Sequence, residues 1–493
     1  MLAAVLIGIA TVTGVVYFIL LRSASYWRRR GLPYVEAPLL WGCTHELFQR
    51  DRPRMLIYPE WTKIYGKTYG IKEGALNTLI TSDLEMIHEI LVKQFDNFYA
   101  RKNLSPASDP EKSEYQTVLT ASGMTWKRLR AVSTPSFSVA SLRKIRPIIE
   151  HSALEMLGVM QKTHGDGSEF NIHEFYMEYS MDIIGRLVLG QSKSSYFDNP
   201  RVYHAKKILL ADMDRPIFHL AHAFPFIRSF LKAEPFAVIR DEVTAVLEKR
   251  IIERESGNCC ESQDFLDILL DYAVQSVERN NNPFKRQLNI AEVVGQAVVF
   301  LVAGFDTTAN SLAFISWMLA CHPDVQRQCV EEVDEFCTEE SIAFDDLSNL
   351  PYLEATIRET LRFFPMATMA NSRKCMQDTD VCGVKIEAGT SIQIDTMSLH
   401  FDRDIWGEDV EEFRPERWLD PERRVPSSAY LAFGGGPRLC IGMKLAILEE
   451  KMALAHLLRR FNVVKAREDY TLRVHGTNAI SPISVPVKLY LRK

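Results

Sequence analysis

The distribution of apolar and polar positions along the chain predicts a mainly helical protein. Apolar residues recur at intervals of three and four, the spacing of one face of an α-helix. This spacing runs through residues 141–161, 290–322, 353–364 and 443–458. Strand-like pieces cluster at 68–81, 381–395 and 480–491. No segment repeats, and the polar stretches 256–262 and 280–283 are typical of mobile connections.

The N-terminus has a different pattern from the rest of the chain. Residues 1–21 carry no charge, and about twenty apolar residues span a bilayer core of roughly 30 Å. Arg22 and the run Arg28–Arg30 follow, which favours a cytosolic location for that flank. A cleaved signal peptide ending near Ser25 is the alternative, but the segment lacks a basic start and its apolar run is too long.

We therefore expect three parts. Residues 1–21 form a transmembrane signal anchor, and residues 22–40 form a basic hinge stiffened by Pro33 and Pro38. Residues 41–493 form one large domain. With 47% hydrophobic and 25% charged residues, the chain can bury a large core.

Charge and cysteine content narrow the class of protein. The formal net charge is −5, so nothing in the composition indicates binding to nucleic acid. The nine cysteines include no Cys-x-x-Cys pair, which indicates reduced thiols facing the cytosol.

One cysteine lies in a distinctive loop, Phe433-Gly-Gly-Gly-Pro-Arg-Leu-Cys-Ile-Gly442. The glycines let the backbone adopt positive φ and approach a flat macrocycle closely. The helix expected from Met443 places Cys440 near a helix N-terminus, which favours a thiolate. These features fit an axial ligand to haem iron. A structural cysteine in a surface turn is the alternative.

Four further motifs accompany the loop. They are Trp126-Lys-Arg-Leu-Arg130, Ala303-Gly-Phe-Asp-Thr-Thr308, Glu359-Thr-Leu-Arg362 and Phe413-Arg-Pro-Glu-Arg-Trp418. With the cysteine loop, their types and order resemble the cytochrome P-450 superfamily of haem-thiolate monooxygenases. The resemblance extends from about Gly31 to near the C-terminus. It is of the microsomal type, nearest the vertebrate drug-metabolising and insect detoxification branch.

The resemblance implies the cytochrome P-450 fold, mainly α with small β-sheets, preceded by one transmembrane helix. It also implies haem b bound through a cysteine thiolate, with O2 as co-substrate. The matching residues for the iron and the cofactor are Cys440, Arg438, Trp126, Arg130, Arg373 and Phe433. For Trp126, an ordinary packed aromatic ring is the alternative.

Two other groups of residues match the family's motifs. Asp306 and Thr307 match a proton-relaying acid and threonine, although a polar helix face or C-cap is the alternative. Glu359, Arg362 and Arg417 match a buried charge group that fixes the haem loop. For that group, the alternative is a solvated salt bridge between residues three apart on a helix.

The chain contains no Gly-x-Gly-x-x-Gly fingerprint, so we expect no NADPH site in it. The resemblance implies electrons from an NADPH-dependent flavoprotein reductase, with cytochrome b5 as a second candidate partner. A basic surface for such a partner would comprise Lys127, Arg128, Arg143, Lys144, Arg438 and Lys444. The expected location is the endoplasmic reticulum membrane, with the catalytic domain in the cytosol.

The function expected from the resemblance is insertion of one oxygen atom into a lipophilic substrate. A haem-thiolate isomerase or dehydratase working without reductase is the alternative, although such relatives typically lose the acid–threonine pair. No feature indicates a haem carrier or gas sensor. The sequence leaves breakdown of xenobiotics or insecticides and metabolism of hormones, steroids or lipids as equal possibilities.

Overall fold

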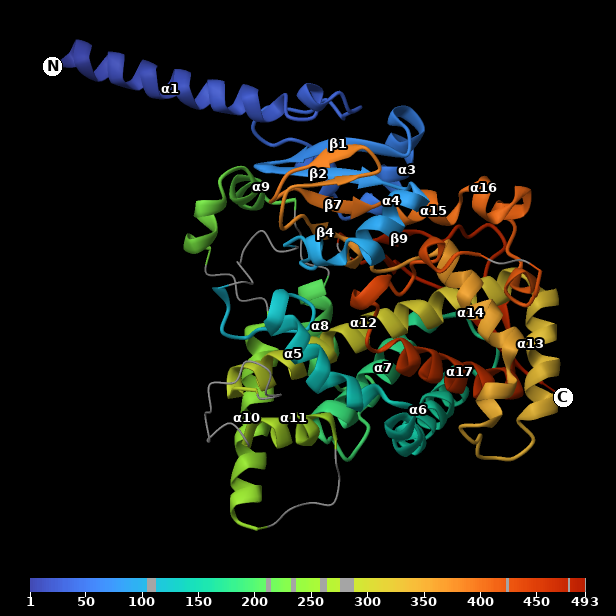
Figure 1. The fold of residues 1–493 in the computed structure, drawn as a ribbon. Helices are drawn as coiled ribbons and strands as arrows, with labels where there is room; N and C mark the ends of the chain where they lie inside the picture. Colours follow the sequence, from blue (N-terminus) through green and yellow to red (C-terminus); the bar gives the residue numbers. More distant parts are fainter. Residues whose placement is uncertain are drawn as a thin grey trace.

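The computed structural model describes residues 1–103, 112–209, 214–231, 236–257, 264–274, 288–422, 425–477 and 479–492. Most of the described chain is helical (Figure 1). The longer helices are α1 (Leu2–Ala24), α3 (Arg54–Tyr65), α5 (Gly123–Ser133), α6 (Val139–His164), α7 (Ile172–Leu189), α8 (Pro200–Leu209), α10 (Ala237–Glu255), α11 (Phe265–Val274), α12 (Ile290–Cys321), α13 (Pro323–Phe336), α14 (Pro351–Phe363) and α17 (Met443–Arg460). The shorter ones are α2 (Thr44–Leu47), α4 (Leu84–His88), α9 (Pro216–Ala223), α15 (Thr396–His400) and α16 (Arg403–Trp406).

Helix α12 forms the centre of the domain. Its start is fixed locally, because the Asn289 side chain accepts from the Glu292 N–H and Glu292 accepts from the Asn289 N–H. Most of its residues from Val293 onward are buried, including apolar ones on every side, as expected of a helix in a large core, and a polar stretch from Asp306 to Ser311 interrupts its middle. It packs against α7, α10, α11, α14 and α17, and Figure 1 shows it crossing the molecule between them.

The strands form small sheets at the edge of this helical core. The largest has the order β1 (Thr68–Glu73), β2 (Leu76–Thr81), β7 (Ser391–Ile394) and β4 (Arg373–Lys374). Its first two strands form an antiparallel hairpin, while β2 and β7 run parallel. The other strands are β3 (Phe170–Asn171), β8 (Phe461–Lys465) and β11 (Pro486–Leu491) in one sheet, and the pairs β5 (Thr379–Val381) with β6 (Val384–Ile386) and β9 (Val474–His475) with β10 (Ser481–Pro482).

The elements expected from periodicity are confirmed. The four predicted helices correspond to α6, α12, α14 and α17, with ends that differ by three residues or fewer. The three strand-like regions contain β1–β2, β6–β7 and β10–β11, while β5 lies just before the second region and shares only Val381 with it. The connections expected at 256–262 and 280–283 lie outside the described residues, apart from Ser256 and Gly257.

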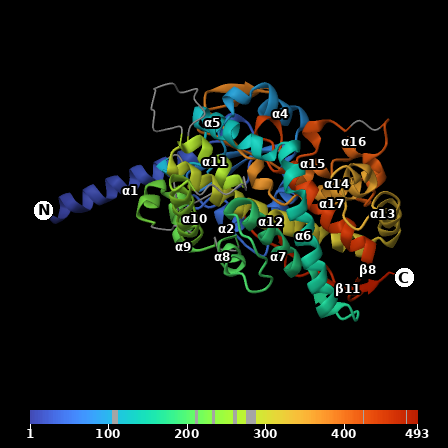
Figure 2. The same ribbon diagram turned by 90° about the horizontal axis from the view of Figure 1, so that it is seen from below.

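Helix α1 projects away from the domain (Figures 1 and 2). Its Leu6–Ala24 segment is apolar and long enough to cross a membrane, and it is not covered by the rest of the chain. α12 meets the same length and composition criteria, but most of it is buried as a core helix. After α1 the chain packs on the largest sheet, because the Trp27 indole donates to the Ile71 carbonyl at 2.9 Å. The expected hinge 22–40 thus contacts the domain near its start.

Candidate functional site

The loop around Cys440 is held by its own backbone. The Cys440 N–H donates to the Phe433 carbonyl at 2.9 Å, and the Gly434 N–H donates to Leu431 at 3.0 Å. Gly434 and Gly436 have φ of 82° and 65°, and a Cβ on Gly436 would overlap the Leu91 backbone. Gly435 is extended, so positive φ occurs at two of the three glycines and not at all three. Close packing on Leu91 fixes the loop's course.

The surroundings of the Cys440 sulfur combine desolvation with positive charge. Part of the Cys440 surface is exposed to solvent, although protein atoms surround the residue on most sides. Desolvation raises the pKa of the Cys440 thiol. Backbone N–H groups of Gly442 and Met443, at the start of α17, and the guanidinium groups of Arg130 and Arg101 all lower it. These donors and charges are the groups that stabilise a thiolate ligand.

Four buried or half-buried arginines gather beside this loop: Arg101, Arg130, Arg373 and Arg438. Burial and the other three guanidinium groups lower the pKa of Arg438 to about 8. Burial and Arg101 lower the pKa of Arg373 to about 9, and burial chiefly lowers that of Arg101 to about 10. The cluster therefore concentrates positive charge with little screening by solvent.

The chemistry of this cluster fits a ligand with two carboxylates. Among the described residues, no carboxylate pairs with any of the four arginines, and Nε of Arg373 is buried without a hydrogen-bond partner. Arg438 also lies over the Trp126 ring, 4.3 Å from its centre. The two propionates of haem b would supply the missing anions. The residues present therefore fit that cofactor.

Sequence reasoning identified three of these arginines and missed Arg101. Its motif, Tyr99-Ala-Arg-Lys102, has no pattern that marks it, and only the fold brings it to the cysteine loop. There Arg101 donates to the carbonyls of Ala370 and Arg438 at 3.0 and 3.1 Å. Because Arg101 binds both carbonyls, we expect it to fix the position of the Ala370 segment relative to the cysteine loop.

Thr307 and Asp306 lie on α12, as expected. The Thr307 hydroxyl donates to the Ala303 carbonyl one turn back at 2.7 Å, so its oxygen lone pairs remain available as acceptors. Asp306 is buried rather than lying on a solvated polar helix face. Burial raises the pKa of Asp306 to about 6, although the hydrogen bond from Asn310 opposes that shift.

Asn310 holds Asp306 within a buried network that the sequence did not reveal. Its amide donates to Asp306 Oδ2 at 3.0 Å and to the Ile480 carbonyl at 3.2 Å. Its oxygen accepts from the Ser481 hydroxyl at 3.0 Å and lies 2.8 Å from His173 Nε2. Because every polar atom of this amide is engaged, the orientation of Asp306 is determined by residues from α7, α12 and β10.

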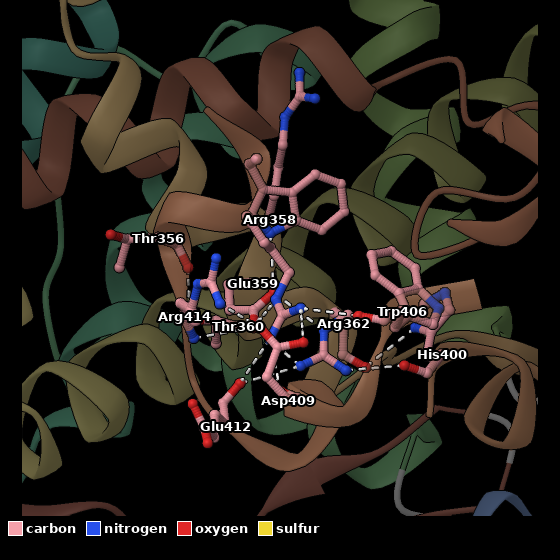
Figure 3. A network of polar contacts seen from close by, with 12 residues as sticks. Thr356, Arg358, Glu359, Thr360, Arg362, His400, Trp406, Asp409, Glu412 and Arg414 are labelled. Atoms are coloured by element: carbon pink, nitrogen blue, oxygen red, sulfur yellow. Dashed lines mark hydrogen bonds and ion pairs between the residues drawn. The ribbon is translucent and has the colours of Figure 1, made fainter. Parts of the chain in front are cut away.

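Figure 3 shows Glu359 and Arg362 beside each other, and Arg417 joins them in one buried cluster of charges. Glu359 and Arg362 have fully buried side chains, which excludes the solvated salt bridge. Glu359 accepts two hydrogen bonds from Arg362 at 2.9 and 3.0 Å and one from Arg417 at 2.8 Å. The Trp418 indole and the Arg414 N–H also donate to it. This carboxylate therefore joins α14 to the segment that precedes the cysteine loop.

Asp409 is a further member that sequence reasoning missed. Its carboxylate lies 3.3 Å from Nη1 of Arg417 and 2.6 Å from Nη1 of Arg414. Arg417 therefore has a second anion, and Glu359 is not its sole counter-charge. Arg362 also donates to the His400 carbonyl at 2.9 Å, and burial lowers the pKa of Arg362.

The expected basic surface needs correction. Arg438 is buried and donates to the carbonyls of Tyr99 and Ala121, so it cannot belong to an exposed face. Arg128 pairs with Glu292, and Arg143 pairs with Asp345 at 2.5 Å. Within the described part of the chain, the members that remain exposed and form no ion pair are Lys127, Lys144 and Lys444.

A separate open cleft of about 450 Å³ lies where α7 ends, between α8 and α10. Arg201 and Glu242 line it and pair with each other at 2.5 Å, so these two charges satisfy each other. None of the predicted site residues lines this cleft. Its position and polarity do not suit the chemistry indicated by Cys440.

The comparisons with known proteins agree with this geometry. The cytochrome P450 family model matches residues 36–489. Three similar proteins of Caenorhabditis elegans are the cytochromes P450 CYP13A10, CYP13A7 and CYP13A2. They are 41%, 39% and 40% identical to the chain, over 95%, 99% and 94% of both sequences. The chain therefore belongs to the cytochrome P450 family, the monooxygenases that bind haem through a cysteine thiolate and use O2.

Proposed function

We propose that this protein is a membrane-bound monooxygenase that inserts one atom of O2 into a lipophilic substrate. Its electrons would come from NADPH through a partner flavoprotein reductase. The observation that carries the proposal is the presence, in one fold, of the Cys440 loop and the intact Asp306–Thr307 pair on α12. An isomerase or dehydratase needs no proton relay of this kind, so the intact pair favours the monooxygenase.

When bound, haem supplies the oxygen chemistry, and its thiolate ligand favours cleavage of the O–O bond. The residues of this chain have supporting roles. Cys440 provides the ligand, and the arginine cluster with Trp126 holds the carboxylates of the cofactor. Thr307 accepts and passes protons at its hydroxyl oxygen. Asp306 carries a proton below about pH 6 and is held in place by Asn310.

The lipophilic substrate is proposed from the side chains near α12. Residues far apart in the sequence meet there, because the Ile480 N–H donates to the Met366 carbonyl at 3.0 Å. Asn310 of α12 binds the Ile480 carbonyl, so both segments adjoin the central helix. Met366, Met369 and Phe305 are apolar and buried in this region. Methionine side chains adapt to irregular shapes, which suits apolar substrates of varied form.

Membrane attachment is proposed from α1. Its apolar side chains are exposed, and only burial in lipid would remove such a surface from water. Arg22 in its last turn and Arg28–Arg30 beyond it support a cytosolic location for the domain, by the positive-inside rule. The endoplasmic reticulum, with its reductase and cytochrome b5, is the proposed location. Lys127, Lys144 and Lys444 are proposed contacts for an acidic partner.

Oxygen consumption tests the reaction. The full-length holoprotein is reconstituted with a flavoprotein reductase, and O2 uptake is measured with NADPH and a panel of lipophilic substrates. We expect uptake that requires both NADPH and reductase, and a product that contains one atom of labelled O2. Conversion of organic hydroperoxides without reductase, and no NADPH-driven product from any substrate, would instead support an isomerase or dehydratase.

Deletion of residues 1–21 tests the topology. The shortened protein should lose most membrane attachment in fractionation while it retains the haem-thiolate spectrum, because the anchor lies outside the domain. In sealed microsomes, protease should digest the domain of the full-length protein from outside. A domain that is protected from protease would contradict the proposed cytosolic orientation.

A further inference from the structure

Two histidines and an aspartate from the N-terminal region and α9 converge on one point. His219 Nε2 lies 2.8 Å from Asp214 Oδ1, and His45 Nδ1 lies 3.4 Å from the same oxygen. All three ligand atoms lie within 4.8 Å of one another. His45 belongs to α2, His219 to α9, and Asp214 precedes α9. None of these residues contributes to the candidate haem site.

The hydrogen bonds of Thr44 determine which nitrogen of His219 carries hydrogen. The Thr44 hydroxyl donates its only hydrogen to the Trp41 carbonyl at 2.9 Å, so its oxygen can only accept from His219. His219 Nδ1 lies 3.0 Å from this oxygen and must therefore be the donor. In a neutral His219 ring, Nε2 then presents a lone pair to the Asp214 carboxylate. Two lone pairs at 2.8 Å repel unless a proton or a metal ion lies between them.

The His219 ring is also held rigidly by its neighbours. Phe48 stacks on it with ring centres 5.3 Å apart, and Trp41 meets it edge-on at 6.3 Å. Packing of this kind, with a fixed hydrogen bond on the second ring nitrogen, is the arrangement that orients histidine ligands in metal sites. The site therefore has an ordered ligand before any metal binds.

We propose that His45, His219 and Asp214 form a binding site for a divalent transition metal, with Zn²⁺ as the best match. Two imidazoles and one carboxylate form a common donor set for zinc, and solvent completes a tetrahedron at the fourth position. His45 Nδ1 lies 3.4 Å from Asp214 Oδ1, the separation expected between two ligands of a tetrahedral ion with bonds of about 2.0–2.2 Å, whereas His219 Nε2, at 2.8 Å, would move away by about 0.5 Å on binding. Imidazole donors select against Mg²⁺ and Ca²⁺.

A metal here would fasten α9 to α2. The two helices are in contact already, and the Ala75 N–H donates to the His222 carbonyl at the end of α9 at 2.8 Å. A third attachment at the start of α9 would fix both ends of this short helix against the N-terminal part of the domain. Figures 1 and 2 place α9 on the side of the domain from which α1 projects.

Calorimetric titration with zinc sulfate tests the site. The probe protein is the full-length holoprotein without a histidine tag, after treatment with a chelator. We expect one equivalent of Zn²⁺ to bind, together with a rise in Tm that depends on zinc concentration. His45→Asn should weaken zinc binding at least tenfold, and because the His45 side chain is 74% exposed, this variant keeps its fold. Thr44→Val should weaken zinc binding by 10- to 100-fold.

The matched control is His151→Asn, which replaces an exposed histidine on α6 and should leave zinc binding unchanged. His219→Asn should abolish the site. Two results would overturn the proposal. One is zinc binding by His45→Asn with the affinity and stoichiometry of the unmodified protein. The other is no zinc-dependent heat or Tm shift in the unmodified protein at micromolar zinc, which would leave a protonated His219–Asp214 ion pair as the correct description.

Discussion

His400 Nε2 accepts a hydrogen bond of 2.9 Å from the backbone N–H of Leu431, which precedes the cysteine loop. The other ring nitrogen, Nδ1, must then donate to the Arg362 carbonyl at 3.1 Å. Burial lowers the pKa of His400 to about 3, which keeps the ring neutral and able to accept. The Glu359–Arg362 cluster is therefore connected to the loop of Cys440 through one imidazole.

This connection gives the buried charges a structural role. Glu359→Gln should destabilise the protein by about 3–5 kcal/mol, because Arg362 would lose its carboxylate in a fully buried site. Arg417 retains Asp409, so the loss falls mainly on Arg362. We expect mostly haem-free or unfolded protein in haem content and thermal unfolding measurements. The exposed pair Arg143–Asp345 supplies the control, since Asp345→Asn should change little. Full haem content and unchanged Tm in Glu359→Gln would refute the structural role.

Cys440 is predicted to be the thiolate ligand. The reduced protein with carbon monoxide should show the red-shifted Soret band of thiolate ligation, and Cys440→His should abolish it because imidazole donates less charge to iron. Cys382→Ser replaces an exposed cysteine and should leave the band intact. Survival of the band in Cys440→His would assign the ligand to another residue.

Thr307 is predicted to direct protons rather than to bind haem. Among the residues that the structure describes, its hydroxyl bonds only to the Ala303 carbonyl of its own helix, so Thr307→Ala should keep the thiolate spectrum and the fold. NADPH electrons should then appear as hydrogen peroxide at the expense of product. The measurement is the ratio of product and peroxide to NADPH consumed, and an unchanged ratio would count against the relay.

The raised pKa of Asp306 predicts that the ratio of product to NADPH consumed depends on pH. Its pKa is raised from 3.8 to about 6, so the protonated acid is present below pH 6 and is lost as pH rises through that value. The amount of product per NADPH consumed should therefore fall as pH rises, with a midpoint near pH 6. Because both quantities scale with the rate of electron delivery, a pH effect on that rate does not change their ratio. Asn310→Ala removes a hydrogen bond that lowers the pKa, so the midpoint should move to higher pH. A midpoint that persists in Asp306→Asn would assign the titration elsewhere.

Replacement of Arg101 by Gln is predicted to have opposite effects on the haem-free and the haem-bound protein. Without an anion, four clustered cations repel, so Arg101→Gln should raise the Tm of the apoprotein. With haem bound, the loss of a cation near the carboxylates should speed haem transfer to apomyoglobin. Arg143→Gln, on an exposed ion pair, should change neither. A slower or unchanged haem transfer from Arg101→Gln would exclude Arg101 from the cofactor site.

Local sequence determined much of this protein. The helical periodicity of α12 and α14, the capping pair Asn289–Glu292 and the glycine loop before Cys440 each act within one or two turns of chain. Such features can be recognised from the sequence because the residues that interact in them are close together along the chain. The five motifs therefore indicated the family, the fold class and the candidate ligand before any contact was known.

The tertiary structure decided which charges meet. Arg101 joins Arg373 and Arg438, Asp409 joins Arg417, and Asn310 orients Asp306 only because segments distant in sequence pack together. Packing also removed Arg438 from the surface face predicted for it. Burial and long-range hydrogen bonding depend on the whole core, which no local pattern encodes. The residues of the site were thus readable from sequence, whereas their electrostatics and mutual support came from the fold.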